Sequence, residues 1–107
     1  MPNISTLAAL AEDLDSGRTS ARRLVDECLA RIADTSGEGA RAFIHVDAEA
    51  AIEAAEAMDR LREVRAAPSA YAGIPISIKD LFDIKGQVTR AGSRALDDSP
   101  PAAGPLV

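Results

Sequence analysis

The chain has 107 residues, of which 47% are hydrophobic and 27% charged, and its formal net charge is -5. This composition is typical of a globular protein and excludes disorder throughout, while the acidic balance argues against the basic surface that a nucleic-acid-binding protein needs. A single cysteine excludes a disulfide framework, and neither an export signal nor a membrane-spanning apolar run is present, so we expect a cytoplasmic protein that contacts neither nucleic acid nor membrane.

Two amphipathic helices are predicted in the first third of the chain. Ser5 is a candidate N-cap, apolar residues follow it at helical spacing, and Gly17 supplies a stop signal. Thr19 or Ser20 then caps a second helix, which carries the most continuous apolar stripe of the sequence. Cys28 lies within that stripe, and we therefore interpret it as a small core residue and not as a nucleophile.

A short strand and a third helix follow. Residues 42–46 contain β-forming side chains, which predicts a strand. Asp47 is a candidate N-cap for a helix that runs to about Val64. His45 is the only histidine, and no acidic pair lies near it at the spacing of metal ligands. We therefore interpret His45 as a structural residue of the strand and expect no metal site.

The charged side chains of this third helix are expected to face solvent. Glu56 and Arg60 form a favourable i,i+4 pair, whereas Asp59 and Glu63 repel each other. The favourable and the repulsive charge pairs nearly cancel in their effect on stability, so we expect the helix to be stabilised mainly by packing. Its apolar stripe consists mainly of alanines, which allow a neighbouring element to approach closely.

A second strand is predicted at residues 73–80, where the apolar pattern changes to a period of two. Three isoleucines share one face of this strand: Ile74, Ile76 and Ile78. Lys79 lies at its C-terminal end, and glycines and prolines predict a loop from Leu81 onward. Ser77 shares a face with Lys79, but side chains two positions apart on a strand run parallel, so we reject a Ser–Lys dyad.

The order of these elements, helix-helix-strand-helix-strand-loop, predicts an α/β fold in which helices pack on a mixed sheet. Two short strands do not form a stable sheet alone, and the apolar stripes need a shared cover. We therefore expect residues 1–107 to be the N-terminal segment of a single, apparently truncated domain. Residues 1–66 are expected to form a helical part with one short strand, and residues 73–107 a lysine-bearing strand and loop.

The most specific motif is GIPISIKDLFDIKG at residues 73–86, continued by TRAGS at residues 89–93. It resembles the lysine-bearing block of the amidase signature family. The resemblance extends upstream through SGRTSA at residues 16–21, LARI at residues 29–32 and AF at residues 42–43, in the order typical of that family. It covers nearly the whole chain and implies the N-terminal portion of the amidase signature fold.

The resemblance implies an amidase that hydrolyses a carboxylic amide C–N bond of a small-molecule substrate through a Ser-cisSer-Lys triad, without metal or cofactor. Lys79 matches the catalytic lysine of that triad, and Lys85, which lacks this context, is expected to be exposed. The aliphatic Ile76 and Ile78 are consistent with the desolvated surroundings that a basic lysine needs. Neither serine of the triad has a match here, so we expect the chain alone to be inactive and to need the remainder of the amidase chain.

Two alternatives remain beside this hypothesis. Within the family, the A subunit of a tRNA-dependent amidotransferase is a close relative, although the residues LFD at 81–83 and TRAGS at 89–93 look more like a stand-alone amidase. Outside the family, the apolar stripes suit a non-catalytic helical interaction fragment, which has no evident use for the strand that carries Lys79. The helices could also form a homodimer, or instead cover the missing sheet.

Overall fold

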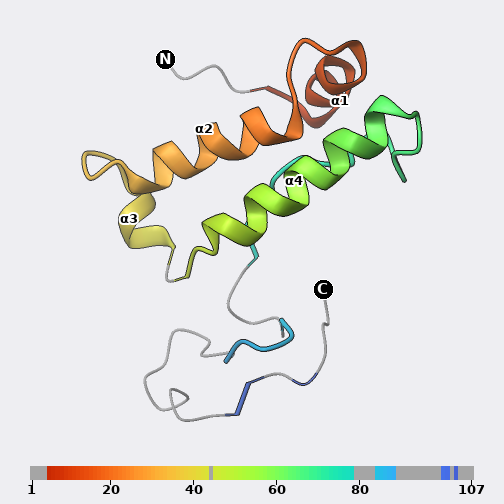
Figure 1. Ribbon diagram of the computed structural model, residues 1–107. Coiled ribbons are helices and arrows are strands. Elements are labelled where there is room, and N and C mark those ends of the chain that lie inside the picture. Colours follow the sequence, from red (N-terminus) through yellow and green to blue (C-terminus); the bar gives the residue numbers. More distant parts are fainter. Residues whose placement is uncertain (1–4, 44, 79–83, 89–99, 102, 104–107) are drawn as a thin grey trace. The chain divides into compact units, whose positions relative to one another are not determined.

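The computed structural model describes residues 5–43, 45–78, 84–88, 100–101 and 103. The chain divides into two units, Met1–Pro75 and Ile76–Val107. Four helices lie in the described part of the first unit: α1 (Leu7–Ser16), α2 (Ala21–Ala33), α3 (Gly39–Ala42) and α4 (Ala48–Glu63). Helices α2 and α4 lie side by side and run in opposite directions, with α3 between them along the chain (Figure 1). None of the described helices is long and apolar enough to span a membrane.

Helix α1 confirms the first predicted helix, with its cap moved by one residue. The hydroxyl of Thr6, and not that of Ser5, accepts a hydrogen bond from the Ala9 amide at 3.1 Å. At the other end, Gly17 has a φ of 79°, and its amide donates to the carbonyl of Leu14. A glycine is favoured there because side chains clash with the backbone in the left-handed region.

The N-terminus of α2 is capped from two sides. The Ser20 hydroxyl accepts from the Arg23 amide at 3.1 Å, as the sequence predicts. The carboxylate of Asp59, on α4, accepts from the amides of Ala21 at 2.7 Å and Arg22 at 3.0 Å. These bonds pair backbone donors that have no partner within the helix, and the negative charge lies at the positive end of the helix dipole. The expectation that Asp59 only faces solvent is therefore wrong.

Removing this interhelical cap is expected to destabilise the helical unit. Asp59→Ala leaves two amides of the first turn of α2 without a protein partner, so the free energy of unfolding should fall by about 1–2 kcal/mol. Urea unfolding followed by circular dichroism measures the difference. Glu63→Ala, at an exposed position of the same helix, is the matched control. Equal midpoints for the two variants would show that the cap contributes nothing.

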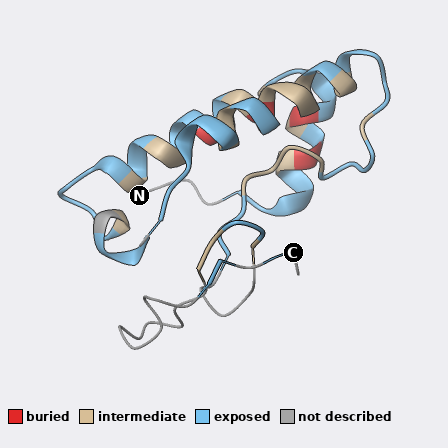
Figure 2. Ribbon diagram, turned by 60° about the horizontal axis from the view of Figure 1, so that its bottom comes forward, coloured by how far each residue is buried: buried red, intermediate tan, exposed pale blue. Residues whose placement is uncertain are grey.

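The core between α2 and α4 is small and rich in alanine. Its buried residues are Ala21, Val25 and Ala55, and four partly buried residues pack around them: Leu29, Ala51, Ile52 and Met58. Buried positions lie where the helices face each other (Figure 2). At the edge of the contact, Arg22 pairs with Glu56 across the helices and with Asp26 along α2. Hydrogen bonds to Asp26 and Glu56 raise the pKa of Arg22 above its ordinary value, so the guanidinium stays charged.

The predicted mixed sheet is wrong for the described residues, which form helices and irregular segments and contain no strand. Of the first expected strand, Ala42 ends α3, and the backbone of Phe43, His45 and Val46 is irregular. Of the second, residues 74–78 are irregular, and Lys79 and Asp80 lie outside the described residues. The physical reason is that a strand needs hydrogen bonds from a neighbouring strand, and no described segment provides that partner.

Helix α3 was not predicted from the sequence, and it shares only Ala42 with the expected strand at residues 42–46. It folds back on α2 through Gly39, where an added Cβ would lie 2.6 Å from the Cα of Ile32. Only glycine permits this approach without a shift of the backbone. This contact joins residues of two different helices. The β-propensity of residues 42–46 depends on local sequence only, so it does not predict the contact.

Candidate functional site

Lys79, the catalytic lysine that the resemblance implies, lies outside the described residues. The structure does describe the segment that precedes the lysine, from the end of α4 to Ile78. The part of this segment that belongs to the first unit ends at Pro75, and residues of the same unit hold it in place.

Helix α4 ends in a turn stabilised by its own backbone. Arg65 has a φ of 56°, and the Ala66 amide donates to the Leu61 carbonyl at 2.8 Å. A bond of this span across a left-handed residue is typical of a Schellman motif. The chain then folds through two further turns, in which Ala72 donates to the Ser69 carbonyl at 3.2 Å and the Ile74 amide to the carbonyl of Tyr71 at 3.2 Å.

The side chain of Arg62 ties this loop to α4. Its Nη2 atom donates to the carbonyl oxygens of Ala70 at 3.1 Å and Ala72 at 3.0 Å. The Nη1 atom lies 3.9 Å from a carboxylate oxygen of Asp15 on α1. Only 15% of the Arg62 side chain is exposed, so the guanidinium forms these contacts largely out of solvent.

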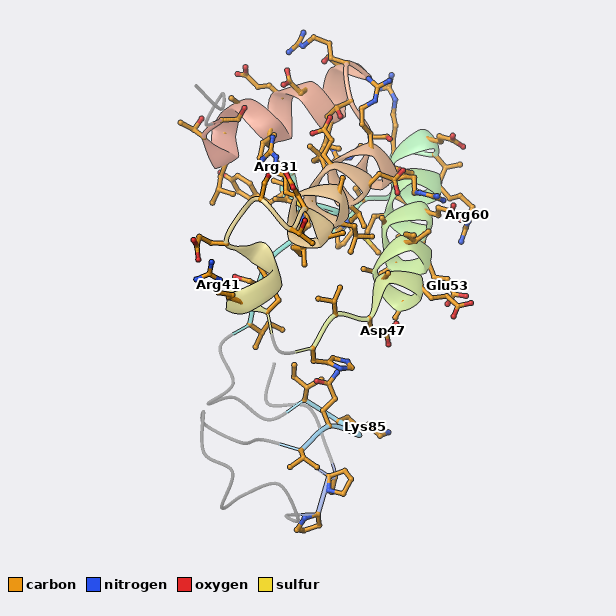
Figure 3. All side chains as sticks on the ribbon, turned by 90° about the vertical axis from the view of Figure 1, so that its left-hand side faces the viewer. Arg31, Arg41, Asp47, Glu53, Arg60 and Lys85 are labelled. Carbon is orange, nitrogen blue, oxygen red and sulfur yellow. The ribbon has the colours of Figure 1, made fainter. Side chains whose placement is uncertain are left out.

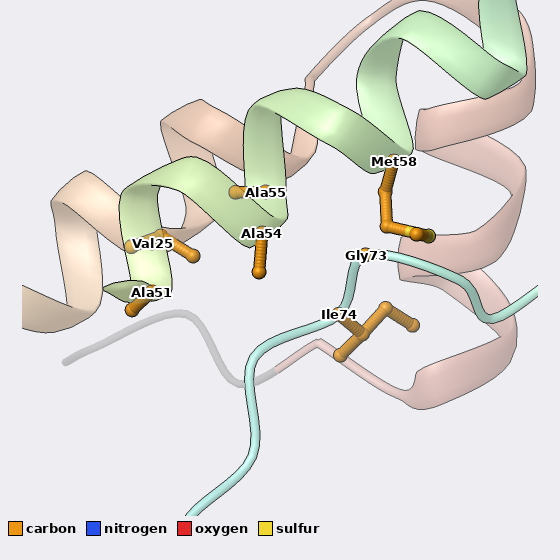
Figure 4. A pocket seen from close by; sticks show the side chains of 7 residues that line it. All are labelled: Val25, Ala51, Ala54, Ala55, Met58, Gly73 and Ile74. Carbon is orange, nitrogen blue, oxygen red and sulfur yellow. The ribbon is translucent and has the colours of Figure 1, made fainter. Parts of the chain in front are cut away.

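Gly73 brings the loop into contact with both long helices. Its φ is 95°, and an added Cβ would lie 2.7 Å from the Cβ of Ala21 and 3.3 Å from the Cβ of Met58. Both the backbone conformation and the lack of space exclude a larger residue. Figure 4 shows Gly73 and Ile74 passing beneath α4, next to Met58. The first residue of the lysine-bearing motif is thus fixed by packing against α2 and α4.

A hollow of about 230 Å³ lies at this contact. Its lining is apolar: Val25, Ala51, Ala54, Ala55, Met58, Gly73 and Ile74 (Figure 4). Proton transfer needs a group that can donate or accept a proton, and none of the described lining residues has such a side chain. The described lining of this hollow therefore supplies no residue for the reaction.

The two isoleucines that the sequence places beside Lys79 are exposed in the described structure. Ile76 is 76% exposed and Ile78 is 40% exposed. A lysine acts as a base only if desolvation, nearby cations or a hydrogen-bond relay disfavour its ammonium form. The role of Lys79 as a base stays a prediction.

The other candidate residues lie apart from any reactive arrangement that the structure describes. Cys28 is half-buried on α2, consistent with a packing role, and Lys85 is exposed, as predicted. His45 is exposed in an irregular segment, so its assignment to a strand is wrong. Among the described residues, no group of three or more His, Cys, Asp or Glu side chains is placed to hold a metal ion. The side chains of Arg60 and Lys85 are shown in Figure 3.

Sequence reasoning missed two residues that organise this region, Asp59 and Arg62. Both lie in the register of the apolar stripe of α4, since Asp59 follows Ala55 by four residues and Arg62 follows Met58 by four. Residues four apart share a helix face. A charged residue at a position of the apolar stripe is a signal that its side chain has a specific partner on another segment, and this signal could have identified both residues.

Comparisons with known proteins agree on one relationship. The family model described as amidase matches residues 23–104. The chain is 44% identical over 91 residues to the A subunit of the glutamyl-tRNA(Gln) amidotransferase of Chloroflexus aggregans, a match that covers 85% of this chain and 18% of that protein. It is 40% identical over 100 residues to the A subunit of the same amidotransferase from Ruegeria pomeroyi, covering 92% of this chain and 20% of that protein.

A solved structure is similar as well. It belongs to a vestigial protein complex that reveals the evolutionary origins of an s-triazine catabolic enzyme. Its sequence is 37% identical, with a TM-score of 0.84 over 94% of this chain and 22% of that chain. A second structure of that complex, with an inhibitor bound, has a TM-score of 0.83 at 36% identity. The chain thus spans about a fifth of the length of the proteins that it matches.

Proposed function

Because this chain belongs to the amidase family, we propose that it supplies Lys79 as the base of a Ser-cisSer-Lys triad in an enzyme that hydrolyses a carboxylic amide. The observation that carries this proposal is the family match over residues 23–104, which includes the whole lysine-bearing motif at residues 73–86. The nucleophilic and bridging serines come from residues outside this chain. The chain is therefore one part of a single amidase domain and is inactive by itself.

In the proposed reaction, Lys79 receives a proton and later returns it. The nucleophilic serine attacks the carbonyl carbon of the amide and passes its proton to the bridging serine, whose own proton moves to the neutral amine of Lys79. The proton then returns along this relay to the nitrogen of the leaving amine as the C–N bond breaks. Water hydrolyses the resulting acyl-enzyme by the same relay. An ammonium cannot accept a proton, so the lysine must be neutral when the reaction begins.

A specific observation favours a second candidate within the same chemistry. Both curated relatives described above are named as the A subunit of a glutamyl-tRNA(Gln) amidotransferase. Such a subunit works with partner subunits, whereas a stand-alone amidase hydrolyses a small-molecule amide without them. The residues at 81–83 and 89–93 favour the stand-alone enzyme, and the names of the relatives favour the amidotransferase. A cytoplasmic location and a homodimer remain part of the first candidate.

A chimera tests the shared part of both candidates. It joins this chain to the remainder of the Chloroflexus aggregans protein, in place of the matching segment of 91 residues. We expect the chimera to release ammonia from glutamine or an amine from a small aryl amide, and the Chloroflexus protein without any such segment to release none. A chimera that folds with the circular dichroism of its parent but hydrolyses no amide, beside an active parent, would contradict the proposal.

The two candidates differ in their need for partners. The protein that carries this chain, purified alone, should hydrolyse simple amides at full rate if it is a stand-alone amidase. If it belongs to an amidotransferase, hydrolysis should rise strongly when its partner subunits and tRNA are added. Steady-state rates with and without these partners decide between the two.

A further inference from the structure

Arg62 is an unusual residue in the first unit, because its charged side chain is largely buried. Its side chain is 15% exposed, and the nearest carboxylate oxygen, on Asp15, is 3.9 Å away. The Asp15 side chain itself is 87% exposed, so solvent weakens this ion pair. The principal partners of the guanidinium are therefore the carbonyl oxygens of Ala70 and Ala72, at 3.1 and 3.0 Å.

The geometry of these two bonds suits arginine. One nitrogen, Nη2, carries two N–H groups in the plane of the guanidinium, and each carbonyl accepts from it. A planar, delocalised group restricts the orientation of the loop more than a rotating ammonium does. Hydrogen bonds from a charged donor are also stronger than the neutral turn bonds that the loop forms with itself. Arg62 thus contributes strongly to the conformation of residues 70–72.

The same loop leads directly into the lysine-bearing motif. Ala72 precedes Gly73, which packs against Ala21 and Met58, and the first unit ends two residues later, at Pro75. We propose that Arg62 is a positioning residue for amide hydrolysis: it holds the loop before Gly73, so that the segment carrying Lys79 begins from one defined backbone conformation. This inference rests on the proposed function.

The expected effect is on the rate of reaction more than on substrate binding. Displacements of about 1 Å in a catalytic group lower rates by up to roughly 100-fold, even when the mutation is far from the reacting atoms. In the active chimera, Arg62→Ala should therefore lower kcat by roughly 10- to 100-fold and leave KM within about twofold. Arg62→Lys keeps the charge and a donor, so it should recover part of the loss.

Arg60→Ala is the matched control. Arg60 lies two residues earlier on α4 and is exposed, with its side chain projecting outward from the helix (Figure 3). Its replacement should leave kcat and KM unchanged. All rates are to be normalised to the folded fraction, measured by thermal unfolding. A purely structural role would lower the melting temperature of the Arg62 variants but leave kcat per folded molecule unchanged, and that result would overturn the inference.

Hydrogen exchange provides a readout that does not depend on activity. In the 107-residue chain, the amides of Ala72 and Ile74 donate to turn carbonyls, and Arg62→Ala should increase their exchange at least about tenfold while Arg60→Ala does not. Equal exchange in all three proteins would show that Arg62 does not hold the loop. An inactive wild-type chimera would overturn the proposed function and this inference with it, whereas an active chimera insensitive to Arg62→Ala would overturn the inference alone.

Discussion

Replacing Lys79 by alanine should lower kcat for amide hydrolysis by the active chimera by roughly 10³-fold, with little change in KM. A positioned general base contributes about 10²- to 10⁴-fold to a reaction rate, and alanine removes that base completely. The bridging serine then has no acceptor for its proton, so the nucleophile remains a neutral hydroxyl. The lysine does not bind the parts of the substrate that set KM, so the loss should fall on kcat. Steady-state release of ammonia measures both constants.

Two further variants separate a base from a mere positive charge. Lys79→Arg keeps a cation at this position, but a guanidinium does not lose its proton, so this variant should be as inactive as alanine. The chain has two lysines, and the other, Lys85, is exposed, so Lys85→Ala is a control that should retain full activity. Substantial activity in Lys79→Arg, or an equal loss in Lys85→Ala, would contradict the assignment.

The second large effect is expected at Gly73, in the stability of the helical unit. Gly73→Ala places a side chain at a φ of 95°, which costs about 1–2 kcal/mol, and its Cβ would lie 2.7 Å from that of Ala21. Relieving that clash costs about 1–3 kcal/mol more, because the backbones of the loop and α2 must separate. The free energy of unfolding should therefore fall by about 2–5 kcal/mol, measured by urea unfolding.

Gly17→Ala is the matched control for the backbone effect. Gly17 has a φ of 79°, but an added Cβ there meets no atom within 4 Å. The free energy of unfolding of this variant should fall only by the cost of a side chain at positive φ, about 1–2 kcal/mol. The difference between the two variants reports the close approach of Gly73 to α2 and α4. Equal losses would show that the loop moves away from the helices without cost.

The three longer helices could be predicted closely because their signals are local. The expected cap of α4, Asp47, accepts from the Ala50 amide at 3.0 Å, and the helix ends at Glu63, one residue before the predicted limit at Val64. Apolar periodicity and capping residues act within one or two helical turns, so a single sequence reveals them.

The elements that failed depend on contacts between distant residues. A strand at residues 74–78 needs a neighbouring strand, and α3 depends on the fit of Gly39 against Ile32. Asp59 was assigned to solvent by its charge, although its partners, the amides of Ala21 and Arg22, lie on another helix. Local propensity depends only on nearby residues in the sequence, so it does not predict any of these contacts.

In the candidate site, too, the sequence revealed some residues and only the structure revealed others. Lys79 was identified by a motif, GIPISIKD at residues 73–80, and not by packing or electrostatics. The residues that hold the beginning of this motif, Arg62 and Gly73, emerged only from the structure, through two carbonyl contacts and one close approach. A sequence motif thus points to Lys79 as the residue proposed to react, and the folded chain shows which contacts hold the residues before it.

The most direct test of the central claim is the position of the Lys79 Nζ atom in a crystal structure of the active chimera. The proposed triad predicts Nζ within hydrogen-bond reach, about 2.6–3.2 Å, of the hydroxyl oxygen of a serine contributed by the rest of the enzyme. That serine should in turn contact the nucleophilic serine. An Nζ atom in solvent, or paired only with a carboxylate far from any serine, would contradict the claim that this chain provides the base for amide hydrolysis.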